Sequence, residues 1–257
     1  MTSDSRKSIY LETSSYLPLI WRTPYSQSLV TLMAKFRQEG ANFYLQKDCI
    51  LEAAGYFSFK DDDWRYHPAV RIRRLVERRG DEELAAFGYP SAAVQLLLGG
   101  NIWPQAQYLN FVRHMAFFCA DLLDGISWEN PRQGLLEFAE RIEKRLSDFQ
   151  DLLASHAKAS ELRLPDPDVM LPYWGPWHLP RLPTPFTIQI LPDPRPYNMT
   201  TDKLRDIYHY DCAIYSTPRP DIVLVANTRF TENVKSSFAK LPCRILCAET
   251  DSASVFG

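Results

Sequence analysis

The stretch Ser8-Ile9-Tyr10-Leu11-Glu12 is a short apolar run that ends on a carboxylate. Such a run is typical of a buried strand. A helix is expected to begin at Thr23-Pro24 and to stop at Gly40, because proline suits the first helical position and glycine ends helices. Its apolar stripe consists of Leu29, Leu32, Met33 and Phe36. A strand followed by a helix therefore opens the chain.

The same alternation continues in the next residues. Asn42 to Gln46 is predicted to be a second strand, and Asp48 is predicted to cap a short helix over Cys49 to Tyr56, which carries Glu52. Strands that alternate with helices indicate an α/β fold with a central parallel sheet.

The last third of the chain shows the same alternation of helices and strands. A helix is predicted over Thr201 to Ser216, and the unbroken apolar run Ile222 to Ala226 is typical of a central parallel strand. Phe230 to Lys240 is a candidate helix, and Arg244 to Cys247 is a final short strand. We therefore predict one discontinuous α/β core, built from residues 1–59 and 201–257, as three layers with helices on both faces of the sheet.

The middle of the chain has a different character. Residues 60–163 show helical spacing of apolar residues and are predicted to be a helical insertion. Residues 164–200 form a Pro/Trp-rich arm that cannot be a long helix, and the arm contains Tyr173-Trp174-Gly175-Pro176-Trp177-His178. Within it, Phe186 to Leu191 alternates like an edge strand or a clasp. The sheet is expected to form from the two flanking pieces alone.

Composition narrows the class of protein. The 257 residues are 46% hydrophobic and 23% charged, which excludes wholesale disorder. A net charge of -2 excludes a globally basic nucleic-acid coat, although a local basic stripe remains open. Five cysteines without a CxxC pair favour a reducing compartment. No apolar run approaches the roughly 18 residues of a membrane span, so a soluble, cytoplasmic protein without membrane contact is expected.

Four polar residues lie where the predicted elements end or turn, namely Glu12, Glu52, Asp211 and Asn227. Ligands of open parallel sheets bind beyond the carboxyl ends of the strands, and Glu12 and Asn227 fall at that edge. Oxygen ligands gathered there suit Mg²⁺ or Mn²⁺. Each residue also has an ordinary explanation. Glu12 would be a solvated strand end, and Glu52 would favour the helix dipole. Asp211 would pair with Arg205, and Asn227 would be a turn residue.

Four motifs in order resemble those of PIN-domain ribonucleases. Residues Tyr10 to Leu19 (Tyr-Leu-Glu-Thr-Ser-Ser-Tyr-Leu-Pro-Leu) look like the opening strand of that family, and Asp48 to Gly55 is similar to its second motif. Tyr210-Asp211-Cys212-Ala213-Ile214 resembles the third motif, and Leu224 to Phe230 resembles the fourth. The resemblance covers roughly residues 8–58 and 201–248 and implies a PIN-like fold.

The resemblance also implies a chemistry. Glu12, Glu52 and Asp211 would hold Mg²⁺ or Mn²⁺, with Asn227 completing the catalytic set, and the ion would supply hydroxide for attack on an RNA phosphodiester. Two positions depart from the family pattern, because Glu12 stands where the family has Asp and Asn227 is a neutral amide. Both departures weaken a metal site.

A basic stripe precedes the helical region. On a helix, Arg71, Arg74 and Arg78 share one face, and Trp64 and Tyr66 lie just before them. Arginine forks match phosphate oxygens and aromatic rings stack on bases, so the stripe is a candidate site for single-stranded RNA. The competing explanation is a solvated helix face that pairs with Glu77 and Asp61 to Asp63.

Other chemistries lack support in the sequence. The five histidines show no His-x3-His or Cys/His spacing, which disfavours zinc, and there is no glycine-rich phosphate loop or Gly-x-Ser-x-Gly elbow. The leading hypothesis is a metal-dependent endoribonuclease. The alternative is a catalytically inactive PIN-like module that binds RNA or protein, including one in a toxin–antitoxin-like system. A second copy of the chain and a small protein partner both remain open as partners.

Overall fold

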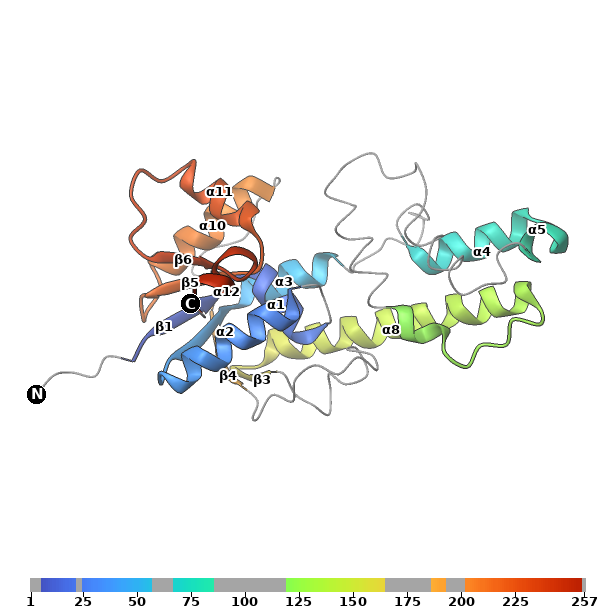
Figure 1. The fold of residues 1–257 in the computed structure, drawn as a ribbon, viewed down its shortest axis with the longest axis horizontal. Helices are drawn as coiled ribbons and strands as arrows, with labels where there is room; N and C mark the ends of the chain where they lie inside the picture. Colours follow the sequence, from blue (N-terminus) through green and yellow to red (C-terminus); the bar gives the residue numbers. More distant parts are fainter. Residues whose placement is uncertain are drawn as a thin grey trace, which may run out of the picture. The chain divides into compact units, whose positions relative to one another are not determined.

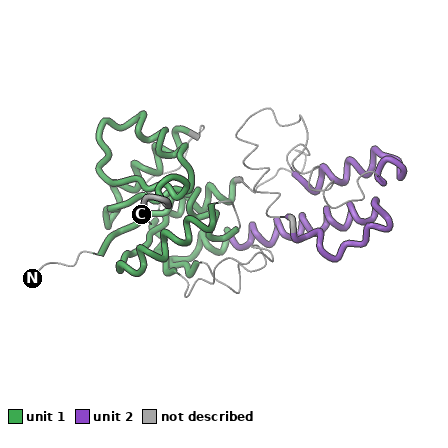
Figure 2. Tube along the Cα trace, in the orientation of Figure 1, with its two compact units in different colours: residues 1–55, 153–257 green, residues 56–152 purple. Residues whose placement is uncertain are grey.

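The computed structural model describes residues 6–21, 25–56, 67–85, 119–164, 186–192 and 202–255. The chain divides into two compact units, shown in Figure 2. Unit 1 comprises Met1–Gly55 and Leu153–Gly257, and unit 2 comprises Tyr56–Leu152. Unit 1 contains the sheet, and the described part of unit 2 contains no strand.

Unit 1 is a mixed α/β structure with a six-stranded sheet, and its colours in Figure 1 show that the two ends of the chain build it together. The strands are β1 (Ser8–Leu11), β2 (Asn42–Gln46), β3 (Glu161–Leu164), β4 (Phe186–Leu191), β5 (Ile222–Val225) and β6 (Arg244–Cys247). Their order is β3-β4-β2-β1-β5-β6. All neighbouring pairs are parallel except β3 and β4, which are antiparallel.

The expected position of the central strands is confirmed. β1 lies between β2 and β5, with Leu11 opposite both Leu45 and Leu224. Every residue of β1 and β5 is buried, which requires cover on both faces of the sheet. One face carries Tyr10, Val223 and Val225, which pack against α10 (Asp202–Ile214) and α11 (Thr228–Lys235).

The remaining helices of unit 1 follow from local sequence. They are α1 (Thr13–Ile20), α2 (Ser26–Gln38), α3 (Lys47–Tyr56), the end of α8 (Pro131–Lys158) and α12 (Ala248–Val255). The stop of α2 is confirmed, because Gly40 follows it with a φ of 78°, a value that favours glycine. Its predicted start at Thr23-Pro24 lies outside the described residues. The chain enters α1 directly after Glu12, and no helix was predicted over these residues, which include Pro18.

Two expectations about the middle of the chain are wrong. The sheet does not form from the flanking pieces alone, because β3 and β4 come from the region between them. β4 alternates buried and exposed residues as an edge strand would, but β3 pairs outside it and forms the edge. β3 begins within the stretch 60–163 that was expected to be helical and ends at the first residue of the predicted arm, and four residues are too few to reveal a strand period.

Unit 2 is helical in its described part. It contains α4 (Pro68–Arg78), α5 (Asp81–Ala85), a 3₁₀ turn η1 (Ala120–Leu123) and most of α8. Arg145 of α8 forms a largely buried ion pair with Asp121 of η1, with Nη1 2.6 Å from Oδ1. None of the helices that the structure describes combines the length and the apolar character that a membrane span needs.

Candidate metal centre

The candidate site lies at the carboxyl ends of the central strands of unit 1. Glu12 follows β1 directly, and its backbone N–H donates to the Leu224 carbonyl of β5 at 3.1 Å, so the strand pairing continues to this residue. The Glu12 side chain then serves as the N-cap of α1, because Oε2 accepts from the Ser14 N–H at 2.8 Å. One Oε2 bond thus fixes the carboxylate while Oε1 points to the rest of the site.

Glu52 reaches the same place from α3. Its Oε2 accepts from the Thr13 hydroxyl at 2.5 Å, and its Oε1 accepts from Nη1 of Arg205 at 3.4 Å. The side chains of Glu12 and Glu52 are each only 7% exposed. Both carboxylates are therefore largely shielded from water, although the sequence alone allowed a solvated acid.

The third member is His209 of α10. Its Nδ1 lies 3.6 Å from Oε1 of Glu12 and 3.6 Å from Oε2 of Glu52. One ligand atom from each of the three residues lies within 4.8 Å of the others. Two atoms bound at about 2.1 Å to one tetrahedral ion would lie roughly 3.4 Å apart. The Glu12–Glu52–His209 cluster is therefore close to the dimensions of a coordination sphere.

The electrostatics of the cluster are coupled. Burial would raise the pKa of Glu12, but the adjacent His209 imidazole and the Ser14 bonds hold it below its ordinary value. Burial and the charge of Glu12 raise the pKa of Glu52, although His209 opposes them. Burial would lower the pKa of His209, yet the two carboxylates raise it. A positive charge between the two acids is therefore favoured, whether a proton or a metal ion supplies it.

Asp206 lies one turn before His209 and adds a further acid beside the cluster. Its Oδ2 accepts from Nδ2 of Asn233 on α11 at 2.5 Å. Burial, followed by the charge of Glu12, raises its pKa to about 7. Sequence reasoning missed both Asp206 and His209, although their i, i+3 spacing on one helix face was a signal that could have paired them.

Asp211 does not belong to the cluster, in contrast to the expectation. It follows His209 by two residues, which rotates its side chain by roughly 200° around the helix. Leu204 and Tyr215 share its face, at spacings of seven and four, and they are 46% and 69% exposed. Asp211 itself is half-buried. The predicted third acid thus points to the outer side of α10, and a histidine takes its place.

Asn227 lies at the expected edge. It follows β5 and precedes α11 as its N-cap residue, but its side chain makes no capping hydrogen bond. The N–H of the neighbouring Ala226 donates to Oγ of Ser14 at 3.0 Å, which ties this end of β5 to α1. Asn227 therefore lies at the same edge of the sheet as Glu12. Among the described residues, however, His209 and not Asn227 completes the group that can hold a metal ion.

The basic stripe belongs to unit 2. Arg71, Arg74 and Arg78 lie on α4, where the first two are half-buried and Arg78 is exposed. Between them, Arg73 forms a two-pronged ion pair with Glu143 of α8. Trp64 and Tyr66 lie outside the described residues, as does the aromatic segment 173–178 of the arm.

Comparison with known proteins gives no further guide to the site. No family model matches the chain, and no curated protein or solved structure is significantly similar to it.

Proposed function

We propose that the protein is a divalent-metal-dependent endoribonuclease with a PIN-like, three-layer α/β/α core. The observation that carries the proposal is the meeting of Glu12, Glu52 and His209 at the carboxyl edge of a parallel sheet, with ligand atoms within 4.8 Å. The strand after which Glu12 stands and the helix that holds Glu52 are those on which the PIN resemblance rests.

The donor set suits a particular group of ions. Two carboxylates and one imidazole fit Mn²⁺ or Zn²⁺ better than Mg²⁺, which prefers oxygen ligands and water. We therefore favour Mn²⁺ over Mg²⁺. Zinc is no longer disfavoured by residue spacing, because ligands from positions 12, 52 and 209 leave no short motif in the sequence.

The residues of the chain would have distinct roles. Glu12, Glu52 and His209 would hold the ion, which when bound activates water and neutralises charge that develops on a phosphodiester. Thr13 and Arg205 hold the Glu52 carboxylate in place through its two oxygens. Asp206 is positioned by Asn233 and could accept a proton near neutral pH. The α4 arginines would position the RNA backbone.

A cleavage assay tests the proposal. Labelled single-stranded RNA is incubated with Mn²⁺, Zn²⁺, Mg²⁺ or EDTA, using wild type, Glu52→Gln and His209→Ala. We expect cleavage with Mn²⁺ that EDTA and both substitutions abolish. Glu232→Gln is the matched control, because Glu232 is an exposed acid on α11 outside the cluster. Cleavage that survives in Glu52→Gln and His209→Ala would contradict the proposal.

One observation favours the alternative of a silent PIN-like module. A proton on His209, which its raised pKa favours, offsets one of the two carboxylate charges, and Arg205 beside Glu52 offsets the other, so the cluster can be balanced without a metal ion. RNA binding that is equal in EDTA and Mn²⁺, without cleavage, would support this alternative. In that case His209→Asp and Asn227→Asp together should increase Mn²⁺ affinity, since both restore acidic ligands.

A further inference from the structure

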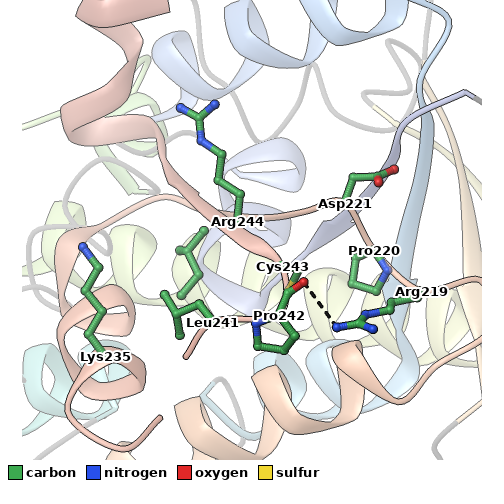
Figure 3. A pocket seen from close by; sticks show the side chains of 9 residues that line it. Arg219, Pro220, Asp221, Lys235, Leu241, Pro242, Cys243 and Arg244 are labelled. Carbon is green, nitrogen blue, oxygen red and sulfur yellow. Dashed lines mark hydrogen bonds between the residues drawn. The ribbon is translucent and has the colours of Figure 1, made fainter. Parts of the chain in front are cut away.

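A hollow in the surface lies at the opposite end of the sheet from the metal centre. It has a volume of about 590 Å³, within the range of small-molecule sites, and Figure 3 shows its lining side chains. It is formed where β5 and β6 begin, because Asp221 precedes β5 and Arg244 is the first residue of β6. We call this hollow the basic pocket, because Arg219, Lys235 and Arg244 line it. The whole length of β5 lies between the basic pocket and Glu12.

Positive charges outnumber negative charges in the lining of the basic pocket. Its lining includes Arg219, Lys235 and Arg244, which come from the loop before β5, the end of α11 and the start of β6. The one acid in the lining is Asp221, whose Oδ2 already accepts from the Ser8 N–H at 2.7 Å. The lining thus carries a formal charge of +2 in a chain whose net charge is -2.

Two of these cations are available for a ligand. All three side chains are exposed, and Lys235 and Arg244 form no ion pair with any described residue. Arg219 is held at one side, because Nη2 donates to the Pro242 carbonyl at 3.2 Å. In Figure 3, Lys235 and Arg219 lie at opposite ends of the group, with Leu241 and Pro242 between them.

The rest of the lining is apolar. It comprises Pro220, Leu241, Pro242, Cys243 and Ile245. Of these, Leu241 and Ile245 are half-buried and also pack against the core under α10 and α11. An apolar wall beside cations that form no ion pair with the described residues suits a ligand that has an anionic end and a flat or apolar body.

We propose that the basic pocket binds a phosphate monoester carried on a nucleoside, either as a free 5′-nucleotide or as the 5′-phosphorylated end of a strand. A phosphate monoester carries a charge of about −1.5 to −2 at neutral pH, which matches the +2 of the lining. Guanidinium and ammonium groups give strong charge-assisted bonds to its oxygens. The base and ribose would lie along Leu241 and Ile245.

Calorimetry on the full chain tests this site in EDTA, so that the metal centre does not contribute. The probes are 5′-UMP, uridine, and a short RNA with or without a 5′-phosphate. We expect 5′-UMP to bind and uridine not to bind. The double variant Lys235→Ala/Arg244→Ala should weaken 5′-UMP binding by roughly tenfold or more, because charged hydrogen bonds are lost.

Two controls keep the result specific. Lys240→Ala removes an exposed lysine that does not line the basic pocket, and it should bind 5′-UMP like wild type. Glu52→Gln alters the metal centre and should also leave binding unchanged, so this proposal can fail or succeed independently of the nuclease proposal. Thermal melting checks that each variant is folded.

The RNA arms distinguish the two sources of the phosphate. If the protein binds 5′-UMP but binds the two RNAs with equal affinity, the basic pocket is assigned to free nucleotides. If the protein prefers the 5′-phosphorylated RNA, the basic pocket is assigned to strand ends. Equal binding of uridine and 5′-UMP, equal loss in Lys240→Ala, or no binding of either phosphorylated probe would overturn the proposal.

Discussion

Nδ1 of His209 lies 3.6 Å from Oε1 of Glu12, so a helix near the end of the chain supplies a base beside the acid that ends the first strand. The two residues are far apart in the sequence, and both side chains are almost fully buried. A buried carboxylate stays charged only beside a compensating positive group. This pairing, completed by Glu52, therefore marks a place in the described part of unit 1 where a cation is favoured.

Metal binding should stabilise the fold. A ligand that binds only the folded state adds about 2.7 kcal/mol at a hundred times its Kd, so Mn²⁺ should raise the Tm of EDTA-treated wild type by several degrees. Glu52→Gln should lose this rise, because a neutral amide replaces one of two carboxylate ligands. Differential scanning fluorimetry with a Mn²⁺ titration measures both, and Glu232→Gln should keep the full shift. An undiminished shift in Glu52→Gln would place the ion elsewhere.

His209 should set the choice of metal. His209→Asp replaces the imidazole by a hard oxygen ligand, which favours Mg²⁺ relative to Zn²⁺. We expect the ratio of Mg²⁺ to Zn²⁺ affinity to rise several-fold in calorimetric titrations. His209→Asn is the control for size, since it has an oxygen donor without the added charge. An unchanged ratio in His209→Asp would show that the imidazole is not a ligand.

Asp206 should make stability fall as the pH rises. Its folded pKa of about 7 lies above the usual value of 3.8, so its favourable contribution is fully present below about pH 4 and is lost progressively as the pH rises from there through 7. Asp206→Asn keeps the shape without the charge. It should raise stability in EDTA by about 1–3 kcal/mol at pH 8, after allowance for solvent screening, and by less than half of that amount at pH 5.

The measurement for Asp206 is urea unfolding of both proteins across this pH range. Asp211→Asn is the matched control, because it makes the same substitution on the outer side of the same helix, away from the Glu12–Glu52–His209 cluster. A gain for Asp206→Asn that is equally large at pH 5 would contradict the assigned pKa.

The Tyr16–His156 bond should contribute to stability within unit 1. The Tyr16 hydroxyl and Nδ1 of His156 are buried and 2.7 Å apart, joining α1 to the end of α8. Tyr16→Phe leaves the imidazole without this partner, which should cost about 1–3 kcal/mol in urea unfolding. Tyr215→Phe removes a hydroxyl from a residue that is 69% exposed and should change stability by less than about 0.5 kcal/mol. A cost below that of the control would mean that the bond is not formed.

The arginine stripe of α4 should act on RNA affinity through charge. If Arg74 and Arg78 contact phosphates, their replacement by alanine should weaken binding uniformly across sequences and reduce the salt slope by about 2. Fluorescence anisotropy at several salt concentrations measures the slope. Arg73→Ala is the control, because it removes one arginine of the same helix that lies outside the stripe and is held by Glu143. An unchanged slope in the double variant would favour a solvated helix face.

The sequence by itself determined most of the core of unit 1. β1, β2 and β6 match the predicted strands, and α2, α3 and α10 lie close to their predicted bounds. These elements are strongly patterned locally, because continuous apolar runs and amphipathic stripes reflect burial directly. Glu12 and Glu52 could be chosen for the same reason, since each stands at a recognisable strand end or helix start. The strand β4 was also recognised, from its alternation over Phe186 to Leu191, but its pairing with β2 and the existence of β3 were not, because pairing partners across the sheet leave no local signal.

The tertiary structure decided that His209, and not Asp211, is the third member of the site. His209 and Asp211 are both polar residues near the middle of α10, and the sequence does not say which of them faces Glu12. The phase of the helix is fixed by Tyr210 and Ala213, which pack into the core against β5. That packing turns His209 toward the two carboxylates and Asp211 toward the exposed face. The rotation of α10 about its axis therefore determines the chemistry of the site, because burial of its apolar side chains outweighs any preference of a single polar residue.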